Sequence, residues 1–336
     1  MSTKRLRGQF YTTNYEYILE GFTGPPENAR CIIEPFAGRG DLLNWVITTK
    51  PIEAYDIDPK GKNILRRDTL LYPPNYEDSW VITNPPYLAR NKTEDKHLFD
   101  KYDTNDLYKC FLNSLENCVG GILIIPAGFF LSPRDIDVRC RDKFMKQYKI
   151  LKVKYFEEQV FDDTTTTVVA FSFERSPNEL TSQLVEWIRM PSKESKVFEM
   201  KSEYDWIIGG EIYHLPGTIK IRRHVEGQPL KENEQQTFMT LNALDTGLQE
   251  GRISLKYQNG YIYPAKDCSR TFATLRIQGI ELSEEKQQEL CNKFNTFLEQ
   301  KREEIWSLFL PQYREYGRKR IPFELAYIIV SHLLTY

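Results

Sequence analysis

The chain has 336 residues, a formal net charge of −2, 27% charged residues and 40% hydrophobic residues. This is the balance of a water-soluble globular protein with room for two domains, and no apolar run is long enough for a membrane span. The basic N-terminus is followed by no apolar stretch, so we expect no signal peptide. Six cysteines and four histidines are scattered without a Cys-x-x-Cys pair, which predicts a cytoplasmic protein with reduced thiols and no metal site.

The first half of the chain alternates short apolar runs with helical stretches. Continuous apolar runs between helices are typical of a parallel sheet that is covered on both faces. We therefore predict an α/β domain over residues 1–175. The expected strands are 31–33, 52–57, 80–83, 122–126, 153–156 and 166–173, and the expected helices are 42–48 and 106–119.

A glycine-rich turn follows the first expected strand. In the segment Glu34-Pro35-Phe36-Ala37-Gly38-Arg39-Gly40-Asp41, the two glycines let the backbone approach a ligand at the carboxyl edge of a sheet. The segment has neither the Gly-x-Gly-x-x-Gly pattern of dinucleotide sites nor the Gly-Lys-Ser/Thr of phosphate loops. A plain tight turn is the alternative interpretation.

Three acidic residues lie around this turn. Asp56 ends the second expected strand, where a carboxylate accepts both hydroxyls of a ribose. Asp68 is placed for the exocyclic amine of an adenine ring, and Glu34 for an ammonium group. A ligand with an ammonium, a ribose and an adenine but no phosphate is S-adenosylmethionine, whereas three carboxylates would repel NAD.

The tetrapeptide Asn84-Pro85-Pro86-Tyr87 follows the apolar strand at 80–83. Two prolines remove two N–H donors and stiffen the chain, and they push Asn84 toward extended geometry. Such a turn can hold a planar group that bears an –NH2, because the side-chain oxygen of Asn84 and the carbonyl of Pro85 would accept its two hydrogens. Tyr87 would stack on the ring. A proline turn that merely closes the strand is the alternative.

In these residues and their order, the chain resembles the adenine-N6 methyltransferases of DNA with the γ order of motifs, of the type II restriction–modification kind. The resemblance covers about residues 8–175. It implies the Rossmann-like fold of S-adenosylmethionine-dependent methyltransferases, with a mostly parallel seven-stranded sheet. It also implies that Phe161, in the segment 159–163, packs against a flipped-out adenine while Asn84, Pro85, Pro86 and Tyr87 serve the transfer. The cofactor-binding residues that it implies are Gln9, Tyr11, Thr12, Glu34, Phe36, Ala37, Gly38, Gly40, Asp56, Ile57, Asp68 and Asn84.

The sequence pattern changes after residue 175, and we predict that residues 176–336 form a separate α+β region for target recognition. Expected strands are 184–188, 206–215, 260–263 and 271–277, and Ser283 is expected to cap a long helix. Basic clusters suggest contacts to DNA, although a charge run is more often a solvated face. The partners implied are double-stranded DNA with a short specific site and a cognate restriction endonuclease, with the protein itself a monomer. The DNA-binding candidates are Arg222, Arg223, Arg318, Lys319 and Arg320.

Other acceptors fit the same turn. A protein glutamine side chain and an RNA base also present a planar –NH2, and N4 of cytosine is chemically equivalent. Glutamine-N5 methyltransferases usually carry a helical domain before the fold and end soon after it, which favours DNA here. A non-catalytic nucleic-acid-binding protein with a methyltransferase fold is the alternative from another class, and the intact Asn84 and Asp56 argue against it.

Overall fold

The computed structural model describes residues 11–162, 164–245, 251–312 and 318–336. The chain divides into two compact units, Met1–Trp206 and Ile207–Tyr336. The division therefore falls later than the predicted 175/176. The reason is that two further strands continue the sheet of the first unit. Within the described ranges, no helix is long and apolar enough to cross a membrane.

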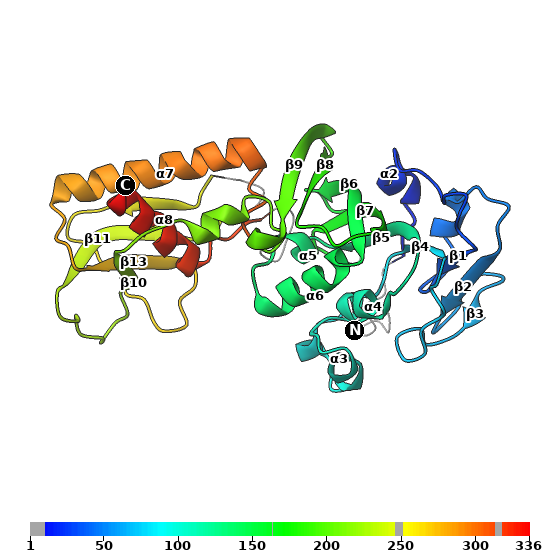
Figure 1. The fold of residues 1–336 in the computed structure, drawn as a ribbon. Coiled ribbons are helices and arrows are strands. Elements are labelled where there is room, and N and C mark those ends of the chain that lie inside the picture. The colour runs from blue at the N-terminus through cyan, green and yellow to red at the C-terminus, as the bar shows by residue number, and fades with distance from the viewer. Residues whose placement is uncertain (1–10, 163, 246–250, 313–317) are drawn as a thin grey trace. The chain divides into compact units, whose positions relative to one another are not determined.

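The first unit is built on a nine-stranded sheet with the order β3-β2-β1-β4-β5-β7-β6-β8-β9 (Figure 1). The strands β3, β2, β1, β4 and β5 are mutually parallel, and β7 runs antiparallel to both of its neighbours. The predicted mostly parallel α/β sheet is confirmed, but its predicted size of seven strands is wrong, because β8 pairs with β6 and β9 pairs with β8. The strands are β1 Ile32–Glu34, β2 Ile52–Asp56, β3 Leu65–Arg66, β4 Trp80–Thr83, β5 Gly120–Pro126, β6 Tyr148–Phe156, β7 Val168–Arg175, β8 Ser182–Met190 and β9 Glu194–Lys201.

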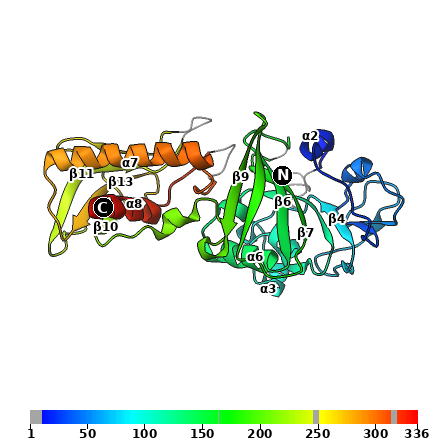
Figure 2. The same cartoon turned by 45° about the horizontal axis from the view of Figure 1, so that its top comes forward.

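Both faces of this sheet carry apolar layers. On one face, α5 and α6 bring aromatic rings onto the sheet: Phe130 lies 5.3 Å from Trp187 of β8 between ring centroids, and α6 runs along β6 (Figure 2). On the other face, Ile18 and Leu19 of α2 join an apolar cluster with alternate residues of β4 and β5. The helices of this unit are α2 Tyr15–Leu19, α3 His97–Lys101, α4 Leu107–Ser114, α5 Gly128–Leu131 and α6 Asp135–Met145, with the 3-10 turns η1 Leu42–Trp45, η2 Arg90–Lys92 and η3 Ser202–Tyr204.

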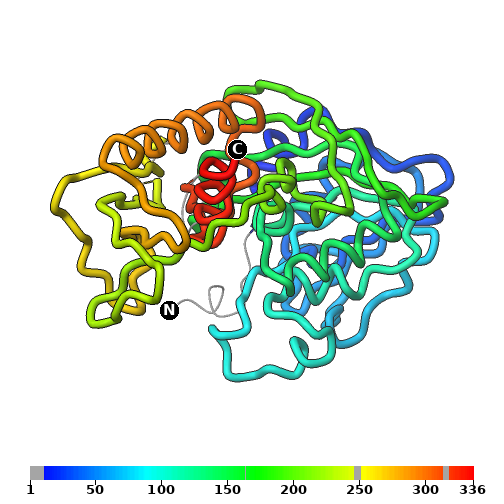
Figure 3. Tube along the Cα trace, turned by 60° about the vertical axis from the view of Figure 1, so that its left-hand side comes forward, coloured from blue at the N-terminus to red at the C-terminus, as the bar shows by residue number. Residues whose placement is uncertain are grey.

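The second unit has a four-stranded antiparallel sheet with the order β10-β13-β11-β12. Alternate residues such as Met239, Leu241 and Leu275 point into an apolar core that α7 and α8 close (Figures 1 and 3). Ser283 caps α7 as predicted, because its side chain accepts the N–H of Lys286. The elements are η4 Gly210–His214, β10 Lys220–Arg223, β11 Glu234–Asn242, β12 Ser254–Tyr257, β13 Phe272–Gln278, α7 Glu284–Ile305 and α8 Phe323–Thr335.

Several predicted elements differ from those observed. The helix expected at 42–48 is the short turn η1, and the helix expected at 106–119 is the eight-residue α4. The strand expected at 206–215 is instead η4, which the left-handed Gly209 precedes (φ 69°). The strand expected at 260–263 is absent, since Gly260 takes φ 71° and Pro264, which follows directly, cannot donate to a ladder.

Candidate active site at the carboxyl edge of the sheet

Four polar residues lie at the carboxyl ends of four neighbouring parallel strands. Glu34 and Asp56 are the last residues of β1 and β2, Asn84 follows β4, and Asp68 comes two residues after β3. Between β1 and β4 the strand order reverses direction, and open α/β sheets bind ligands at such a switch point. A cavity of about 230 Å³ opens there, and all four side chains line it.

The glycine turn and Asp56 form one hydrogen-bonded structure. The N–H of Gly38 donates to Asp56 Oδ2 over 2.8 Å, and the N–H of Asp58 donates to Oδ1 over 2.7 Å. Gly38 has φ +53°, and a Cβ at this position would lie 2.8 Å from Cε1 of Tyr11. Glycine is therefore required both by the backbone conformation and by the ring packed on the turn.

Glu34 is the most unusual group in the cavity wall. Its side chain is 1% exposed, and within the described residues its Oε2 has no hydrogen-bond partner. Burial raises the pKa of Glu34 well above its usual range, and the carboxylates of Asp41 and Asp56 raise the pKa further. A buried carboxyl oxygen without a partner is costly in free energy. A donor or cation in the cavity would remove that cost.

The Asn-Pro-Pro-Tyr turn brings Asn84 and Pro86 into the same cavity. Asn84 is 8% exposed, and its Nδ2 donates to Thr12 Oγ1 over 3.1 Å. The Tyr87 hydroxyl contacts Asn84 Oδ1 and lies 2.8 Å from the carbonyl oxygen of Ile124. Burial raises the pKa of Tyr87 well above its ordinary value, so this phenol stays protonated.

Asp106 holds the chain just after this turn. Its Oδ1 accepts the N–H of Leu88 over 3.1 Å, and the N–H of Leu107 donates to the carbonyl oxygen of Leu88 over 3.2 Å. Burial raises the pKa of Asp106 to about 6, against the opposing effect of the ammonium of Lys109. Leu88 and Leu107 both line the cavity, so Asp106 supports its wall.

Most of the predicted cofactor residues line this one cavity. Gln9 lies outside the described residues, and Gly40 does not line the cavity. Asp68 lines it, but its Oδ1 already accepts the N–H groups of Leu70 and Leu71 over 3.1 and 3.0 Å. The predicted residues in the lining are Tyr11, Thr12, Glu34, Phe36, Ala37, Gly38, Asp56, Ile57, Asp68, Asn84 and Pro86.

Three residues predicted to act in the transfer do not line this cavity. Pro85 is buried beside it, and Tyr87 packs at the margin of the apolar cluster that contains α2. Phe161 belongs to the same cluster and is only 4% exposed. Contact between Phe161 and a base therefore requires its present surroundings to open, and it stays a prediction.

The cavity also has lining residues that the sequence analysis missed. Asp41 lies inside the glycine motif and could have been chosen, because its carboxylate follows the second glycine directly. Leu98 and Leu107 come from α3 and α4, and a leucine on a helix carries no signal that separates a cavity wall from ordinary packing. The missed residues are Asp41, Leu42, Arg67, Thr69, Leu70, Leu88, Leu98 and Leu107.

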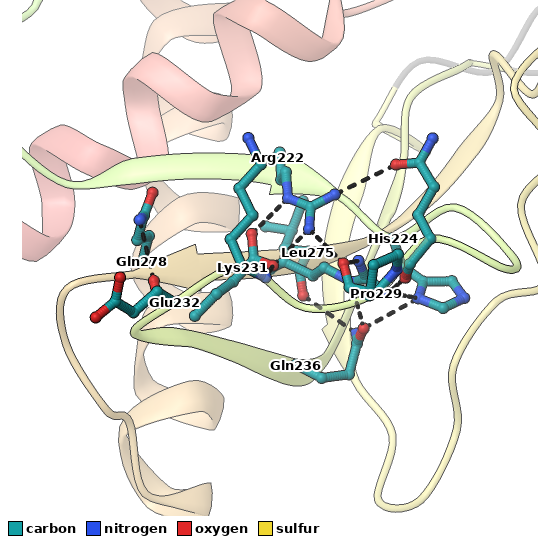
Figure 4. A network of polar contacts seen from close by, with 11 residues as sticks. Arg222, His224, Pro229, Lys231, Glu232, Gln236, Leu275 and Gln278 are labelled. Atoms are coloured by element: carbon teal, nitrogen blue, oxygen red, sulfur yellow. Dashed lines mark hydrogen bonds and ion pairs between the residues drawn. The ribbon is translucent and has the colours of Figure 1, made fainter.

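In the second unit, the predicted DNA-binding residues make internal contacts. Arg222 forms a doubly hydrogen-bonded ion pair with Glu234, whose side chain is 2% exposed, and also donates to Pro229 O over 3.1 Å. Arg276, across the ladder from Arg222, donates to the same carbonyl over 3.1 Å. Figure 4 shows Arg222 and Pro229 within this network. The geometry supports a structural role for Arg222, and its contact with DNA stays a prediction.

The other basic candidates lie around one aromatic ring or are buried. The guanidinium carbon of Arg223 lies 5.5 Å from the ring centroid of Phe323, and that of Arg320 lies 6.0 Å from it. Arg223 also donates to the carbonyl oxygens of Ser269 and Asp267. Lys319 is 0% exposed, which is unsuited to a phosphate contact, while Arg318 is half-buried.

Among known protein families, one model matches part of the chain. Residues 79–161 match the family model of the Eco57I restriction-modification methylase, a segment that begins one residue before β4, contains Asn84 to Tyr87 and ends at Phe161. The search of curated proteins gives no match.

Among solved structures, several similar chains come from restriction–modification systems. A Vibrio vulnificus YJ016 protein assigned as a modification subunit of a type I restriction enzyme has 16% identity and a TM-score of 0.42, over 56% of this chain and 49% of its own. A type I methyltransferase subunit from Streptococcus thermophilus has 14% identity and a TM-score of 0.39, over 55% and 48%. The type IIG restriction endonuclease BpuSI has 14% identity and a TM-score of 0.39, over 66% and 36%. The chain thus spans about half or less of the length of these three proteins.

Proposed function

We propose that this protein is a site-specific DNA methyltransferase that transfers a methyl group from S-adenosylmethionine to N6 of adenine. The observation that carries the proposal is the place of the Asn-Pro-Pro-Tyr turn. It leaves β4 at the switch point of the sheet, and Asn84 and Pro86 line the same cavity as Glu34 and Asp56. The match of residues 79–161 to a restriction-modification methylase family supports the same activity.

The cavity fits a ligand with positive charge and no phosphate. Among the residues that the structure describes, four carboxyl groups line it (Glu34, Asp41, Asp56 and Asp68) against one guanidinium, that of Arg67. The Oε2 of Glu34 would accept a hydrogen from an ammonium group, and the remaining lone pairs of Asp56 would accept ribose hydroxyls. S-adenosylmethionine would supply an electrophilic methyl group on its sulfonium.

The protein's own part in the transfer would be hydrogen bonding and positioning. The N6 lone pair of adenine is delocalised into the ring and is a poor nucleophile. Acceptance of the two N–H groups by Asn84 Oδ1 and the Pro85 carbonyl would localise that lone pair on nitrogen. An amide side chain is no base, so the N6 proton would leave to water after the transfer. Most of the rate enhancement would then come from orientation.

An adenine inside a duplex cannot reach this cavity, so the base would be flipped out at a cost of about a few kcal/mol. Stacking on Tyr87 would offset part of that cost, at roughly 1–3 kcal/mol per stacked base by analogy with single-strand binders. We propose double-stranded DNA with a short specific site as the substrate. Binding should weaken steeply as the salt concentration rises, because phosphate contacts release counterions.

The test is long-read sequencing of DNA from a methylation-deficient bacterial host that expresses the protein. N6-methyladenine confined to one short motif, and absent with Asn84→Ala, would establish the activity and the target together. Calorimetry on both proteins should show that S-adenosylmethionine binding survives the substitution. Unmodified DNA from a host with soluble protein that binds S-adenosylmethionine would contradict the proposal and direct the search to RNA or protein acceptors.

A further inference from the structure

We infer that the loop between β12 and β13, residues 258–271, is a DNA-binding element of the second unit. Lys266 and Arg270 would contact phosphates, and the ring of Tyr261 would lie against the adjoining deoxyribose and base edges. The inference rests on the proposed function, because it names the surface that holds the DNA substrate. None of these residues belongs to the basic clusters that the sequence suggests as DNA contacts.

Exposed aromatic rings gather at this loop. Among the described residues of the second unit, the exposed phenylalanine, tyrosine and tryptophan side chains are Tyr261 at 38%, Phe272 at 38% and Tyr336. The ring of Tyr263 lies 5.4 Å from that of Phe272 between centroids, tilted by 42°. Single apolar side chains are common on protein surfaces, whereas several aromatic rings together are typical of a binding surface. Surfaces that bind nucleic acids combine such rings with cations.

Two cations lie on the same loop without acidic partners. Lys266 and Arg270 are both exposed, and within the described part of the chain neither side chain makes an ion pair or a hydrogen bond. The one carboxylate of the loop, that of Asp267, accepts a hydrogen bond from Nε2 of Gln228 over 3.4 Å. A cation without a protein partner gives up no contact when it meets a phosphate. Its full charge therefore serves to release counterions from the DNA.

The backbone of the loop is held in place. The carbonyl oxygen of the buried Ala265 accepts the N–H of Glu226 over 2.9 Å. A tight turn follows, in which the N–H of Lys266 donates to Ser269 Oγ over 3.0 Å and the N–H of Ser269 donates to the carbonyl oxygen of Lys266 over 2.9 Å. Lys266 and Arg270 thus flank a single turn.

Arg223 holds this turn from β10. Its guanidinium donates to the carbonyl oxygens of Asp267 and Ser269. An arginine that the sequence suggests as a DNA contact therefore orients the segment that carries Lys266 and Arg270. Cations on an ordered backbone lose less conformational entropy on binding than cations on a mobile loop. The loop presents an already arranged pair of cations beside an exposed ring.

The loop contains a native thiol that reports on DNA contact. Cys268 lies between Lys266 and Arg270 and is the exposed cysteine of the chain, since the other five are buried. The rate at which a maleimide alkylates Cys268 in the full-length protein is measured with and without a duplex that contains the motif methylated in the bacterial host. We expect bound DNA to slow the reaction, and high salt to restore the rate. Cys268→Ser should remove the rapid reaction and so identify the thiol.

Charge substitution provides the second measurement. The double substitution Lys266→Ala and Arg270→Ala removes two cations from the loop. Lys286→Ala and Lys293→Ala remove two exposed lysines from α7 and form the matched control. We expect the loop variant to bind DNA at least about tenfold more weakly at low salt, with a slope of log affinity against log salt that is shallower by about two. The Kd for S-adenosylmethionine should not change in either variant, and Tyr261→Ala should weaken DNA binding about five- to tenfold.

Two results would overturn the inference. One is alkylation of Cys268 at the same rate in the DNA-bound and the free protein. The other is a loop variant whose DNA affinity and salt slope match those of the α7 control. Wild-type protein that methylates DNA and gives either result keeps the proposed function and rejects only the DNA contact of this loop. Wild-type protein that binds no DNA rejects both.

Discussion

The backbone N–H of Gly38 donates to the carboxylate of Asp56, 18 residues further along the chain, over 2.8 Å. The glycine turn and the second strand are thereby built as one unit, and the carboxylate is oriented before any ligand arrives. A site with its acceptors already placed loses less conformational entropy when a ligand binds.

Gly38→Ala should damage this unit. The new methyl group would lie 2.8 Å from the Tyr11 ring, in a backbone conformation with φ +53° that alanine disfavours by about 1 kcal/mol. We expect S-adenosylmethionine affinity to fall at least about tenfold by calorimetry. Gly24→Ala is the control, because a Cβ there meets nothing within 4 Å. Equal affinities for the two variants would mean that the turn does not hold the ligand.

Glu34→Gln should stabilise the ligand-free protein and weaken cofactor binding. In the folded state the pKa of Glu34 is raised above its unfolded value, so its contribution to stability is present at low pH and lost as pH rises through the folded pKa. Glutamine removes that pH dependence. The melting temperature of the variant should therefore exceed that of the wild type at high pH and match it at low pH.

The same carboxyl should give cofactor affinity a pH dependence. If the ionised form of Glu34 holds an ammonium group, affinity should rise with pH until Glu34 is deprotonated in the free protein, and the profile of Glu34→Gln should be flat. Calorimetric Kd values across this range provide the check. Parallel profiles for the two proteins would show that Glu34 does not bind the ligand's charge.

Asp106→Asn tests the support behind the Asn-Pro-Pro-Tyr turn. The pKa of Asp106 is raised from 3.8 to about 6, which corresponds to at most roughly 3 kcal/mol of stability that is present below pH 4 and lost as pH rises past 6. The difference in melting temperature, variant minus wild type, should grow between pH 4 and pH 7. A constant difference over this range would show that the pKa of Asp106 is not raised in this way.

Arg222→Ala should destabilise the second unit by about 2–4 kcal/mol, because it leaves the buried carboxylate of Glu234 without its ion-pair partner. The unfolding midpoint in urea measures this loss. Lys220→Ala, at an exposed position on the same strand, is the control and should change little. A stable Arg222→Ala protein with weakened DNA binding would instead restore Arg222 as a DNA contact.

The structural features that could be predicted from the sequence are those with a recognisable pattern in a short stretch of residues. The strand expected at 80–83 has these bounds in the structure, and the polar residues expected at the strand ends line one cavity, because parallel strands end at a common edge. Membership of β8 in the sheet could not be read, since its partner Lys152–Phe156 lies about thirty residues earlier. The ion pair that Arg222 makes inside the second unit likewise depends on a partner that strand pairing brings close. Composition alone does not reveal that partner.

The network around Arg222 bears on attempts to change the proposed DNA specificity. Residues that look like readers of DNA by charge are here part of the framework of the second unit, together with Arg276 and Pro229. In a library that randomises these residues, many variants would fail to fold, so that their specificity could not be selected. Productive diversity should therefore be placed at exposed positions of that unit, with the arginine framework held constant.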